Sequence, residues 1–516
     1  MGPISEKIYL RLLAISEDTP VSDQQRIRLA LLELGYENVI FPLSVLGKLY
    51  PLCREHSDIT VTLVFRETDW VITNIEAGDQ RAHHYALAVD YGSTTVVMRL
   101  IDMNSGVAVA EEKAVNRQAD FGADILTRIT YSLEGPEHTE DLHRATTETF
   151  QDLLARLYED TGIDTALCPV MTISGNTTMI HFLLKLNAWT VFAAPFAPVC
   201  HDPGFFWGRE LGFDFPGLVY LFPAASNYVG GDIISGLLVL DIHKKEETCL
   251  FFDIGTNGEL VLGNRDWMLA GAGAAGPALE GYISRFGMRA QPGAIDTVSI
   301  ASTSLSFTTI QNQKPIGICG SGIIDLIAQM RLNGWIDAAG QLNPAASERI
   351  VYLEEEREYA AVYALATESA TETPLFFSQT DIDQYLDTKA AAYTMVDCLL
   401  ETAGVQTEEL ALVYLSGAFP AHSDLESAIT VGIFPDLPRE RYHCIANTSL
   451  EGAQLLLLDG SKLRDARELA NNLYCVQFAS IPDFLIRMQA AKFISHTDMN
   501  RYPTIRNRLQ NKENYR

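Results

Sequence analysis

The fold is decided by two stretches of the chain that share one pattern. The first is Tyr85-Ala-Leu-Ala-Val-Asp90-Tyr-Gly92-Ser93-Thr94-Thr95, and the second is Leu250-Phe-Phe-Asp253-Ile-Gly255-Thr256-Asn257-Gly258-Glu259. Each has an apolar run that predicts a buried strand, an Asp-x-Gly turn with a hydroxyl residue, and a second apolar run directly after the turn. The pattern predicts an internal duplication, with one acidic hairpin in each of two lobes.

Each hairpin carries the residue types that bind a phosphate and its magnesium ion. The strand places the Asp at its carboxyl end, and the glycine allows a tight turn close to a phosphate. The hydroxyls and backbone N–H groups that follow can contact phosphate oxygens, and the Asp can hold Mg²⁺ through water. Two such turns facing one another would grip a triphosphate between the lobes. The alternative reading of Asp90 and Asp253 is a pair of carboxylates that cap their own turns.

The composition excludes several classes of protein. The chain has 516 residues, of which 47% are apolar and 20% charged, which is typical of a globular protein with two or more domains. With 38 basic and 66 acidic residues the net charge is −28, so we expect neither nucleic acid nor a membrane as a partner. No apolar run is long enough to cross a membrane, and the N-terminal residues lack the pattern of a secretory signal. These observations predict a cytoplasmic location.

Cysteine and glycine motifs argue against several other sites. The eight cysteines are scattered without a Cys-x-x-Cys pair, so we expect no iron–sulfur cluster, zinc site or disulfide framework. No Gly-Lys-Ser/Thr occurs, which excludes a P-loop. The string Gly271-Ala-Gly273-Ala-Ala-Gly276 matches a dinucleotide fingerprint, but it lies deep in the chain and Pro277 follows it. His83-His84 and His422-Ser423-Asp424 are expected to lie in surface loops.

The chain divides by pattern into four parts. Residues 1–80 predict a small α+β domain, in which Ser22–Leu34 is a helix with Ser22 as its cap, and Ile59–Phe65 and Trp70–Ile75 form a hairpin. From residue 85 strands alternate with helices, which predicts lobe I over 85–245 and lobe II over 246–490. Residues 491–516 are predicted to be a basic polar tail.

Five segments, in order, resemble the signature of the acetate and sugar kinase, heat-shock ATPase and actin superfamily. The two hairpins are the phosphate motifs. The others are two small-residue connecting helices and an adenosine-binding turn: Val229-Gly230-Gly231-Asp232-Ile-Ile-Ser-Gly236, Ser427-Ala428-Ile-Thr-Val-Gly432 and Val413-Tyr-Leu-Ser416-Gly417-Ala418-Phe419. The resemblance implies an α/β fold of two actin-like, ribonuclease-H-like ATPase lobes preceded by the small α+β domain.

Residues 85 to about 490 resemble more narrowly the ATPase domain of the reductive activators of corrinoid proteins. The matching runs include Phe121–Ile129, Ser174–Met179, Ala274–Gly281 and Gly317–Asp325. Family members carry a ferredoxin domain, often N-terminal, and this chain begins where that domain would have ended. We therefore expect the electron to come from a separate ferredoxin or flavodoxin. Two features depart from the family pattern: Gly271–Gly273 replaces a frequent Cys-Ser, and Pro420 replaces a usual Gly.

The resemblance gives each motif a role. Asp90 and Asp253 would hold Mg²⁺ through water, and Asp232, Glu259 and Asn176 would be the catalytic residues. The nucleotide-binding residues would be Asp90, Gly92, Ser93, Thr94, Thr95, Asp253, Gly255, Thr256, Asn257, Gly320, Ser321, Gly322, Ser416, Gly417 and Ala418. Structural readings stay open beside these: Asp232 as a helix-start acid, Glu259 as an exposed strand acid, Asn176 as a helix cap, and Gly320–Gly322 as a site of tight packing.

The implied activity is the ATP-dependent return of cob(II)alamin to cob(I)alamin in a corrinoid protein of a methyltransferase system. Two other functions stay open. One is a small-molecule kinase, for which Asp124 or Asp232 could be the base. The other is a nucleotide-gated module that binds a corrinoid protein without turnover. The sequence leaves open the identity of the corrinoid protein and whether the chain forms a homodimer.

Overall fold

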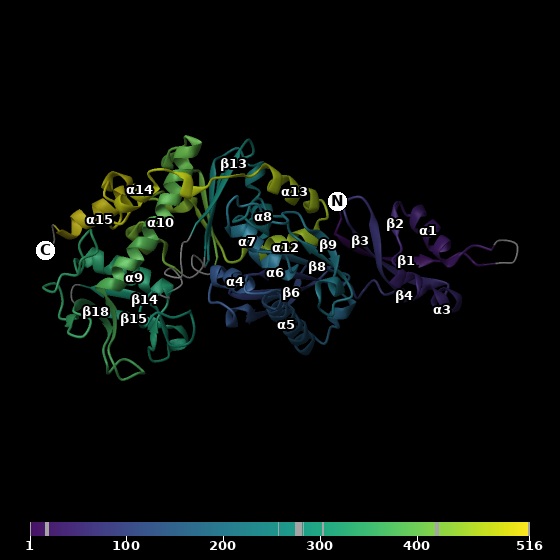
Figure 1. Ribbon diagram of the computed structural model, residues 1–516, viewed down its shortest axis with the longest axis horizontal. Helices are drawn as coiled ribbons and strands as arrows, with labels where there is room; N and C mark the ends of the chain where they lie inside the picture. The colour runs from purple at the N-terminus through teal and green to yellow at the C-terminus, as the bar shows by residue number, and fades with distance from the viewer. Residues whose placement is uncertain are drawn as a thin grey trace. The chain divides into compact units, whose positions relative to one another are not determined.

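The chain folds into two compact units (Figure 1). The structure, a computed structural model, describes residues 2–513 apart from 16–19, 256, 274–280, 282, 302–303 and 418–422. Unit 1 comprises Met1–Asp241 and Thr448–Leu473, and unit 2 comprises Ile242–Asn447 and Tyr474–Arg516. This division differs from the predicted boundaries because residues 448–473, assigned to lobe II by their place in the sequence, pack within unit 1.

Unit 1 begins with the predicted small α+β domain. Its sheet has the order β1-β3-β4-β2, with β1 (Ser5–Arg11), β2 (Val39–Ile40), β3 (Asp58–Phe65) and β4 (Trp70–Ala77). Strands β3 and β4 form the predicted hairpin. Helix α1 (Asp23–Glu33) begins after Ser22, whose hydroxyl accepts a hydrogen bond from the backbone N–H of Gln25, as the sequence predicted. Helices α2 (Leu43–Leu46) and α3 (Leu49–Glu55) follow it.

His84 is buried against the small domain, so the expectation that it lies in a surface loop is wrong. Its side chain is only 5% exposed, and its Nε2 lies 3.0 Å from Oγ of Ser5 on β1. Burial, together with the nearby charge of Lys7, lowers the pKa of His84 to about 4, and Asp102 opposes this shift. The contact comes from a strand that lies far away in the sequence, which the local pattern around His84 does not reveal.

We expect His84 to make the fold sensitive to acid. The folded imidazole resists protonation, while the unfolded one accepts a proton near pH 6.5, so stability is lost as the pH falls from about 6.5 to about 4. The loss in the free energy of unfolding should be about 3 kcal/mol. Urea unfolding at several pH values should show a smaller loss over this range for His84→Gln than for the exposed control His83→Gln. A wild-type pH dependence in His84→Gln would contradict the prediction.

The main sheet of unit 1 has the strand order β7-β6-β5-β8-β10-β9. Its strands are β5 (Tyr85–Tyr91), β6 (Thr95–Asp102), β7 (Ala108–Val115), β8 (Val170–Gly175), β9 (Gly204–Trp207) and β10 (Leu218–Leu221). Strands β5, β6 and β7 are antiparallel neighbours, whereas β8 runs parallel to β5 and β10 parallel to β8.

The two faces of this sheet are covered by different helices. Alternate residues of a strand point to opposite faces. Leu87 and Val89 of β5 therefore pack in the core that includes Phe150 of α5 (Pro136–Thr161). Asp90 lies on the opposite face, where α12 (Thr448–Leu458) contacts β5 and β8. The remaining helices of unit 1 are α4 (Ile125–Ser132), α6 (Thr177–Leu183), α7 (Trp189–Phe192), α8 (Gly231–Leu240) and α13 (Lys462–Asn472).

Helices α8 and α12 cross at very close range. A Cβ on Gly452 would lie 2.1 Å from the backbone oxygen of Ser235 and 2.4 Å from its carbonyl carbon, so only glycine fits there. Helix α8 thus packs against α12 within unit 1. The segment that the sequence predicted as the second connecting helix is Ser427–Gly432. Those residues belong to α11 (Leu425–Val431), which packs against α9 (Gly320–Asn333) in unit 2. Both α11 and α12 contain small residues, so the local sequence pattern does not show which of them packs on α8.

Unit 2 repeats the sheet of unit 1. Its order is β21-β20-β11-β12-β13-β22, with β11 (Cys249–Ile254), β12 (Gly258–Gly263), β13 (Met268–Gly273), β20 (Leu412–Ser416), β21 (Tyr442–Ile445) and β22 (Tyr474–Cys475). Strands β11, β12 and β13 are antiparallel neighbours, β20 runs parallel to β11, and β21 runs parallel to β20. The same arrangement relates β5, β6, β7, β8 and β10, so the predicted duplication of lobes is confirmed.

Two smaller sheets and several helices complete unit 2. The sheets have the orders β15-β14-β16 and β17-β18-β19. Their strands are β14 (Ala294–Ala301), β15 (Ser304–Thr309), β16 (Gly317–Ile318), β17 (Ile350–Leu353), β18 (Glu358–Ala364) and β19 (Leu375–Ser378). The helices are α9, α11, α10 (Gln379–Ala403), α14 (Phe484–Ala491) and α15 (Pro503–Glu513). Among the described helices, none has the length and hydrophobicity that a membrane span requires.

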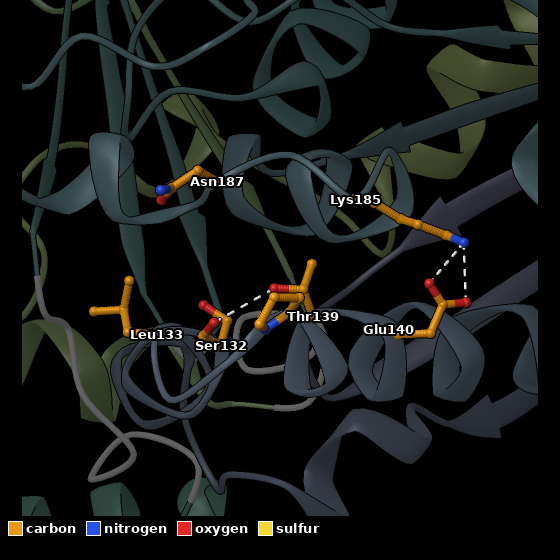
Figure 2. Close-up of a pocket in the computed structure, with 7 residues that line it drawn as sticks. Ser132, Leu133, Thr139, Glu140, Lys185 and Asn187 are labelled. Carbon is orange, nitrogen blue, oxygen red and sulfur yellow. Dashed lines mark hydrogen bonds and ion pairs between the residues drawn. The ribbon is translucent and has the colours of Figure 1, made fainter.

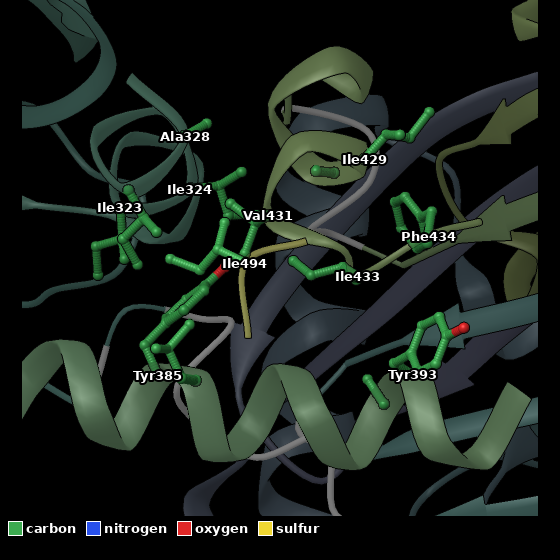
Figure 3. Close-up of a cluster of buried hydrophobic side chains, with 14 of the residues drawn as sticks. Ile323, Ile324, Ala328, Tyr385, Tyr393, Ile429, Val431, Ile433, Phe434 and Ile494 are labelled. Carbon is green, nitrogen blue, oxygen red and sulfur yellow. The ribbon is translucent and has the colours of Figure 1, made fainter. Parts of the chain in front are cut away.

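Residues 491–505 contribute to the core of unit 2, in contrast to the polar tail that the sequence predicted for 491–516. Figure 3 shows Ile494 beside Ile324 of α9 and Val431 of α11, with Tyr385 of α10 close by. Tyr502 and Ile505 are also fully buried. This segment has several basic residues and few apolar ones, so the sequence gives little indication that one of its faces is buried.

Lys389 of α10 fastens this C-terminal segment. The lysine is fully buried, and its Nζ donates hydrogen bonds to the backbone oxygens of Ala491 (2.6 Å), Phe493 (2.7 Å) and Ser495. Burial lowers the pKa of Lys389 well below the ordinary value for a lysine. Without this side chain each of the three carbonyls would lose a donor, and a buried acceptor without a partner costs free energy.

We expect Lys389→Met to loosen the C-terminal segment. Methionine has a similar volume but donates no hydrogen bond, and relief from burying an ammonium group offsets only part of the loss. The net loss of local stability should be about 2 kcal/mol. It would be measured as faster amide hydrogen exchange in residues 503–513. Lys492→Met, which removes a partly exposed ion pair with Asp387, is the control and should change exchange little. Equal exchange rates in the two variants would rule out a fastening role.

Candidate functional site

The carboxyl ends of β5 and β8 and the start of α8 meet in unit 1. Asp90 of β5 lies opposite Ser174 of β8 in register. A Cβ on Gly230, the cap of α8, would lie 2.5 Å from Cα of Asn176, so α8 begins directly against the turn that follows β8. Asp232 lies in the first turn of α8. The structure therefore brings Asp90, Asn176 and Asp232 together, although they lie far apart in the sequence.

Asp232 and Asp90 are close enough to affect each other's charge. Burial raises the pKa of Asp232 to about 7, and the charge of Asp90 contributes to the rise. The backbone N–H of Ile233 donates to Oδ1 of Asp232 (3.0 Å) and opposes the shift. A divalent cation would favour the ionised form of both carboxylates. Carboxylate oxygens are the ligand type that Mg²⁺ prefers, so the chemistry of Asp90 fits the predicted role in holding this ion through water.

The turn between β5 and β6 has a tightly fixed backbone. A Cβ on Gly92 would lie 2.5 Å from the backbone oxygen of Thr95. The Nδ2 of Asn116 donates to the backbone oxygen of Gly92 (3.0 Å), and Nη1 of the buried Arg128 donates to that of Ser93 (2.6 Å). Both carbonyls thus have a side-chain donor that helps to fix the backbone of the turn. A contact of this turn with a phosphate stays a prediction.

Asn176 and Asp124 both cap helices. The Oδ1 of Asn176 accepts a hydrogen bond from the backbone N–H of Met179 (3.0 Å), so the helix-cap reading is confirmed, while a contact to phosphate stays a prediction. Asp124 is exposed and caps α4 through the backbone N–H of Thr127 (2.8 Å). Asp124, one of the two candidate bases for a kinase, thus has a structural role as a helix cap.

The second hairpin gathers its own polar side chains in unit 2. Asp253 of β11 lies opposite Glu259 of β12 and Ser416 of β20, so the three side chains share one face of the sheet. Gly417 follows with φ +104°, and a Cβ there would lie 2.1 Å from the backbone oxygen of Ile254, so this turn requires glycine. The predicted residues Thr256 and Ala418 lie outside the described part of the chain, as do Pro420 and His422.

Gly320, Ser321 and Gly322 open α9, as predicted. A Cβ on Gly322 would lie 2.5 Å from the backbone oxygen of Ile295, and the hydroxyl of Ser321 donates to that of Asp296 (3.0 Å). The packing reading is therefore confirmed for Gly322. A role of this helix start in lining a nucleotide pocket stays a prediction.

Ser449 is a residue of the site that the sequence analysis missed. Its hydroxyl donates a hydrogen bond to Oδ1 of Asp90 (2.8 Å). It lies in the first turn of α12, three residues before the glycine that packs on α8. The sequence does carry a signal for this residue. The run Ser449-Leu-Glu-Gly452-Ala453 is a helix start with small residues, similar to Ser427–Gly432.

A pocket of about 280 Å³ lies elsewhere in unit 1, between the end of α4 and the start of α5 (Figure 2). The residues that line it are Ser132, Leu133, Pro136, Thr139, Glu140, Lys185 and Asn187. Lys185 and Glu140 form an ion pair (2.8 Å). None of the predicted site residues lines this pocket, and its charged groups neutralise one another.

Comparison with known proteins agrees with the geometry. Residues 247–506 match a family model described as the C-terminal, ASKHA domain of RACo, and residues 85–245 match the RACo middle region. The chain is 29% identical over 480 residues to the corrinoid activation enzyme RamQ of Eubacterium limosum, covering 88% of this chain and 81% of the relative. It is 26% identical over 278 residues to a reductase of the methylated amine-specific corrinoid protein from Methanosarcina barkeri, covering 49% of this chain and 46% of the relative.

A solved structure is similar over almost the whole chain. It is a reductive activator for a corrinoid, iron–sulfur protein, with 32% sequence identity and a TM-score of 0.88. The match covers 97% of this chain and 81% of the solved one. Because the family models match both lobes and the solved relative matches the small domain as well, the chain belongs to the RACo family of reductive activators of corrinoid proteins.

Proposed function

We propose that this protein is an ATPase that drives the reduction of cob(II)alamin to cob(I)alamin in a corrinoid protein of a methyltransferase system. The observation that carries the proposal is the repeated acidic hairpin. Asp90 and Asp253 occupy the same place in two sheets of the same topology, within a family of corrinoid activators. The relatives named as corrinoid activation enzyme and corrinoid protein reductase support the choice of partner.

The proposed chemistry is phosphoryl transfer from ATP to water. Asp90 and Asp253 would hold Mg²⁺ through water, and the turns Gly92–Thr95 and Gly255–Asn257 would position the phosphates. Bound Mg²⁺ would neutralise phosphate charge as the bond to the leaving group breaks. Asp232, Asn176 and Glu259 would orient the attacking water. In this proposal the chain contributes positioning and electrostatic stabilisation and forms no covalent intermediate.

Nucleotide state would be coupled to partner binding. A conformational ATPase can assist an uphill electron transfer only if its ATP and ADP states bind the corrinoid protein with different affinities. ATP would favour the complex in which the cobalt is easier to reduce, and hydrolysis would release the partner. By reciprocity the corrinoid protein should tighten ATP binding by the same factor. We propose a separate reduced ferredoxin or flavodoxin as the electron donor.

The test is a cobalamin absorbance assay with a candidate corrinoid protein, a low-potential reductant and ATP. The spectrum of cob(I)alamin should appear only when both ATP and this chain are present. A non-hydrolysable ATP analogue should support at most one reduction per chain. Full reduction with that analogue would favour a binding module without turnover. Formation of a phosphorylated small molecule, without any cob(I)alamin, would favour the kinase.

A further inference from the structure

Three serine hydroxyls form a buried chain that ends on Asp90. The Oγ of Ser449 lies 2.8 Å from Oδ1 of Asp90 and 2.9 Å from Oγ of Ser174. The Oγ of Ser174 lies in turn 2.7 Å from Oγ of Ser235 on α8. Ser174 and Ser235 are fully buried and Ser449 is 5% exposed. All four residues belong to unit 1.

The proton count fixes the direction of the bond to Asp90. An ionised carboxylate can only accept hydrogen bonds, and each serine has one proton to donate. Ser449 must therefore donate to Asp90. The Oγ of Ser235 donates to the backbone oxygen of Asp232 (2.9 Å), which can only accept, and Ser174 has one proton to share between Ser235 and Ser449. The bond from Ser449 to the carboxylate is thus charge-assisted and lies in a buried environment, where it is stronger than a bond between neutral groups.

The packing of α12 places Ser449 at this point. Thr172 of β8 donates from its Oγ1 to the backbone oxygen of Ala453 (2.9 Å), and Gly452 touches the backbone of Ser235. Helix α12 is thus held against both β8 and α8, one turn after Ser449. The hydroxyl cannot leave Asp90 without a shift of the helix or a change of rotamer.

We propose that Ser449 is a positioning residue that holds the carboxylate of Asp90 in one orientation for the magnesium-bound nucleotide. The inference rests on the proposed function and extends it to a helix that the sequence motifs do not include. Ser449 acts through Asp90 and does not itself need to touch the nucleotide. A purely structural role would instead be limited to packing α12 against the sheet.

The variant Ser449→Ala separates these two roles. We expect it to weaken binding of ADP with Mg²⁺ about fivefold to tenfold, as measured by calorimetry, and to lower kcat to a similar extent. Binding of ADP without Mg²⁺ and the midpoint of thermal unfolding should stay close to wild type. The matched control is Ser461→Ala, because Ser461 donates a similar bond (2.7 Å) to Oδ1 of Asp459 in the same unit. Equal behaviour of the two variants would overturn the inference, as would equal weakening with and without Mg²⁺.

A double-mutant cycle with Asp90→Asn tests whether Ser449 acts through Asp90. In the Asp90→Asn background, Ser449→Ala should change the affinity for ADP with Mg²⁺ less than about twofold. The same loss in both backgrounds would show that Ser449 acts elsewhere and overturn the proposal.

The outcomes also separate this proposal from the function on which it rests. If the wild-type protein binds the nucleotide but hydrolyses none, the ATPase assignment fails and the calorimetric cycle still decides the role of Ser449. If the protein hydrolyses ATP and Ser449→Ala is silent, only the inference on Ser449 fails. If the wild-type protein binds no nucleotide, both are wrong.

Discussion

Changing Asp90 to asparagine should slow ATP hydrolysis by about 100-fold to 1000-fold while the protein stays folded. Asparagine has nearly the same size, and its Oδ1 can still accept the hydrogen bond from Ser449. What it lacks is the negative charge that would attract Mg²⁺ beside Asp232. The loss should therefore appear mainly in kcat and in the Mg²⁺ concentration needed for half-maximal activity.

The control for this variant is Asp459→Asn. Asp459 also accepts a serine hydroxyl, that of Ser461, and its exchange should leave hydrolysis within about twofold of wild type. Steady-state release of phosphate at several Mg²⁺ concentrations would measure both variants. Hydrolysis by Asp90→Asn at the rate of Asp459→Asn would remove the first hairpin from the proposed site.

A single methyl group at position 452 should destabilise unit 1 substantially. In Gly452→Ala the new Cβ would lie 2.1 Å from the backbone oxygen of Ser235, so one helix must move. Overpacking against backbone costs about 3 kcal/mol, which would lower the midpoint of thermal unfolding by about 5–10 °C. Because the same movement displaces Ser449 from Asp90, ATP hydrolysis should fall as well.

Gly47→Ala is the matched control for this variant. A Cβ on Gly47 meets its nearest neighbour, the backbone oxygen of Leu43, at an ordinary 3.5 Å, and the residue has a helical backbone. Its thermal midpoint, followed by circular dichroism, should stay close to wild type. If Gly452→Ala unfolds at the same temperature as Gly47→Ala, α8 and α12 do not pack as closely as the structure indicates.

The sequence predicted those features that short stretches encode. The two hairpins could be recognised because strand, Asp-x-Gly turn and second strand follow one another within about a dozen residues, and backbone pairing completes them locally. Caps such as Ser22 and Asn176 were predictable for the same reason, since cap and helix are neighbours in the sequence.

Features that depend on distant segments were missed or misplaced. The packing of α12 on α8 depends on a close backbone contact of Gly452, which the residues around Gly452 do not indicate. His84 is buried and contacts Ser5 of the first strand. Lys389 is buried and binds backbone oxygens of residues 491–495. Ser449 meets Asp90 only after the chain has built most of unit 2. Such contacts leave no periodic pattern in the sequence around either residue.

The return of α12 to unit 1 has a consequence for how the protein is made. Asp90 and its partner Ser449 are separated by 359 residues, and a ribosome adds about 5–20 residues per second, so about 20–70 s pass between their syntheses. Throughout that interval the face of β5 and β8 that α12 covers lacks its helix, while nearly all of unit 2 is being translated. The first lobe therefore cannot complete this face of its sheet until residue 473 has left the exit tunnel.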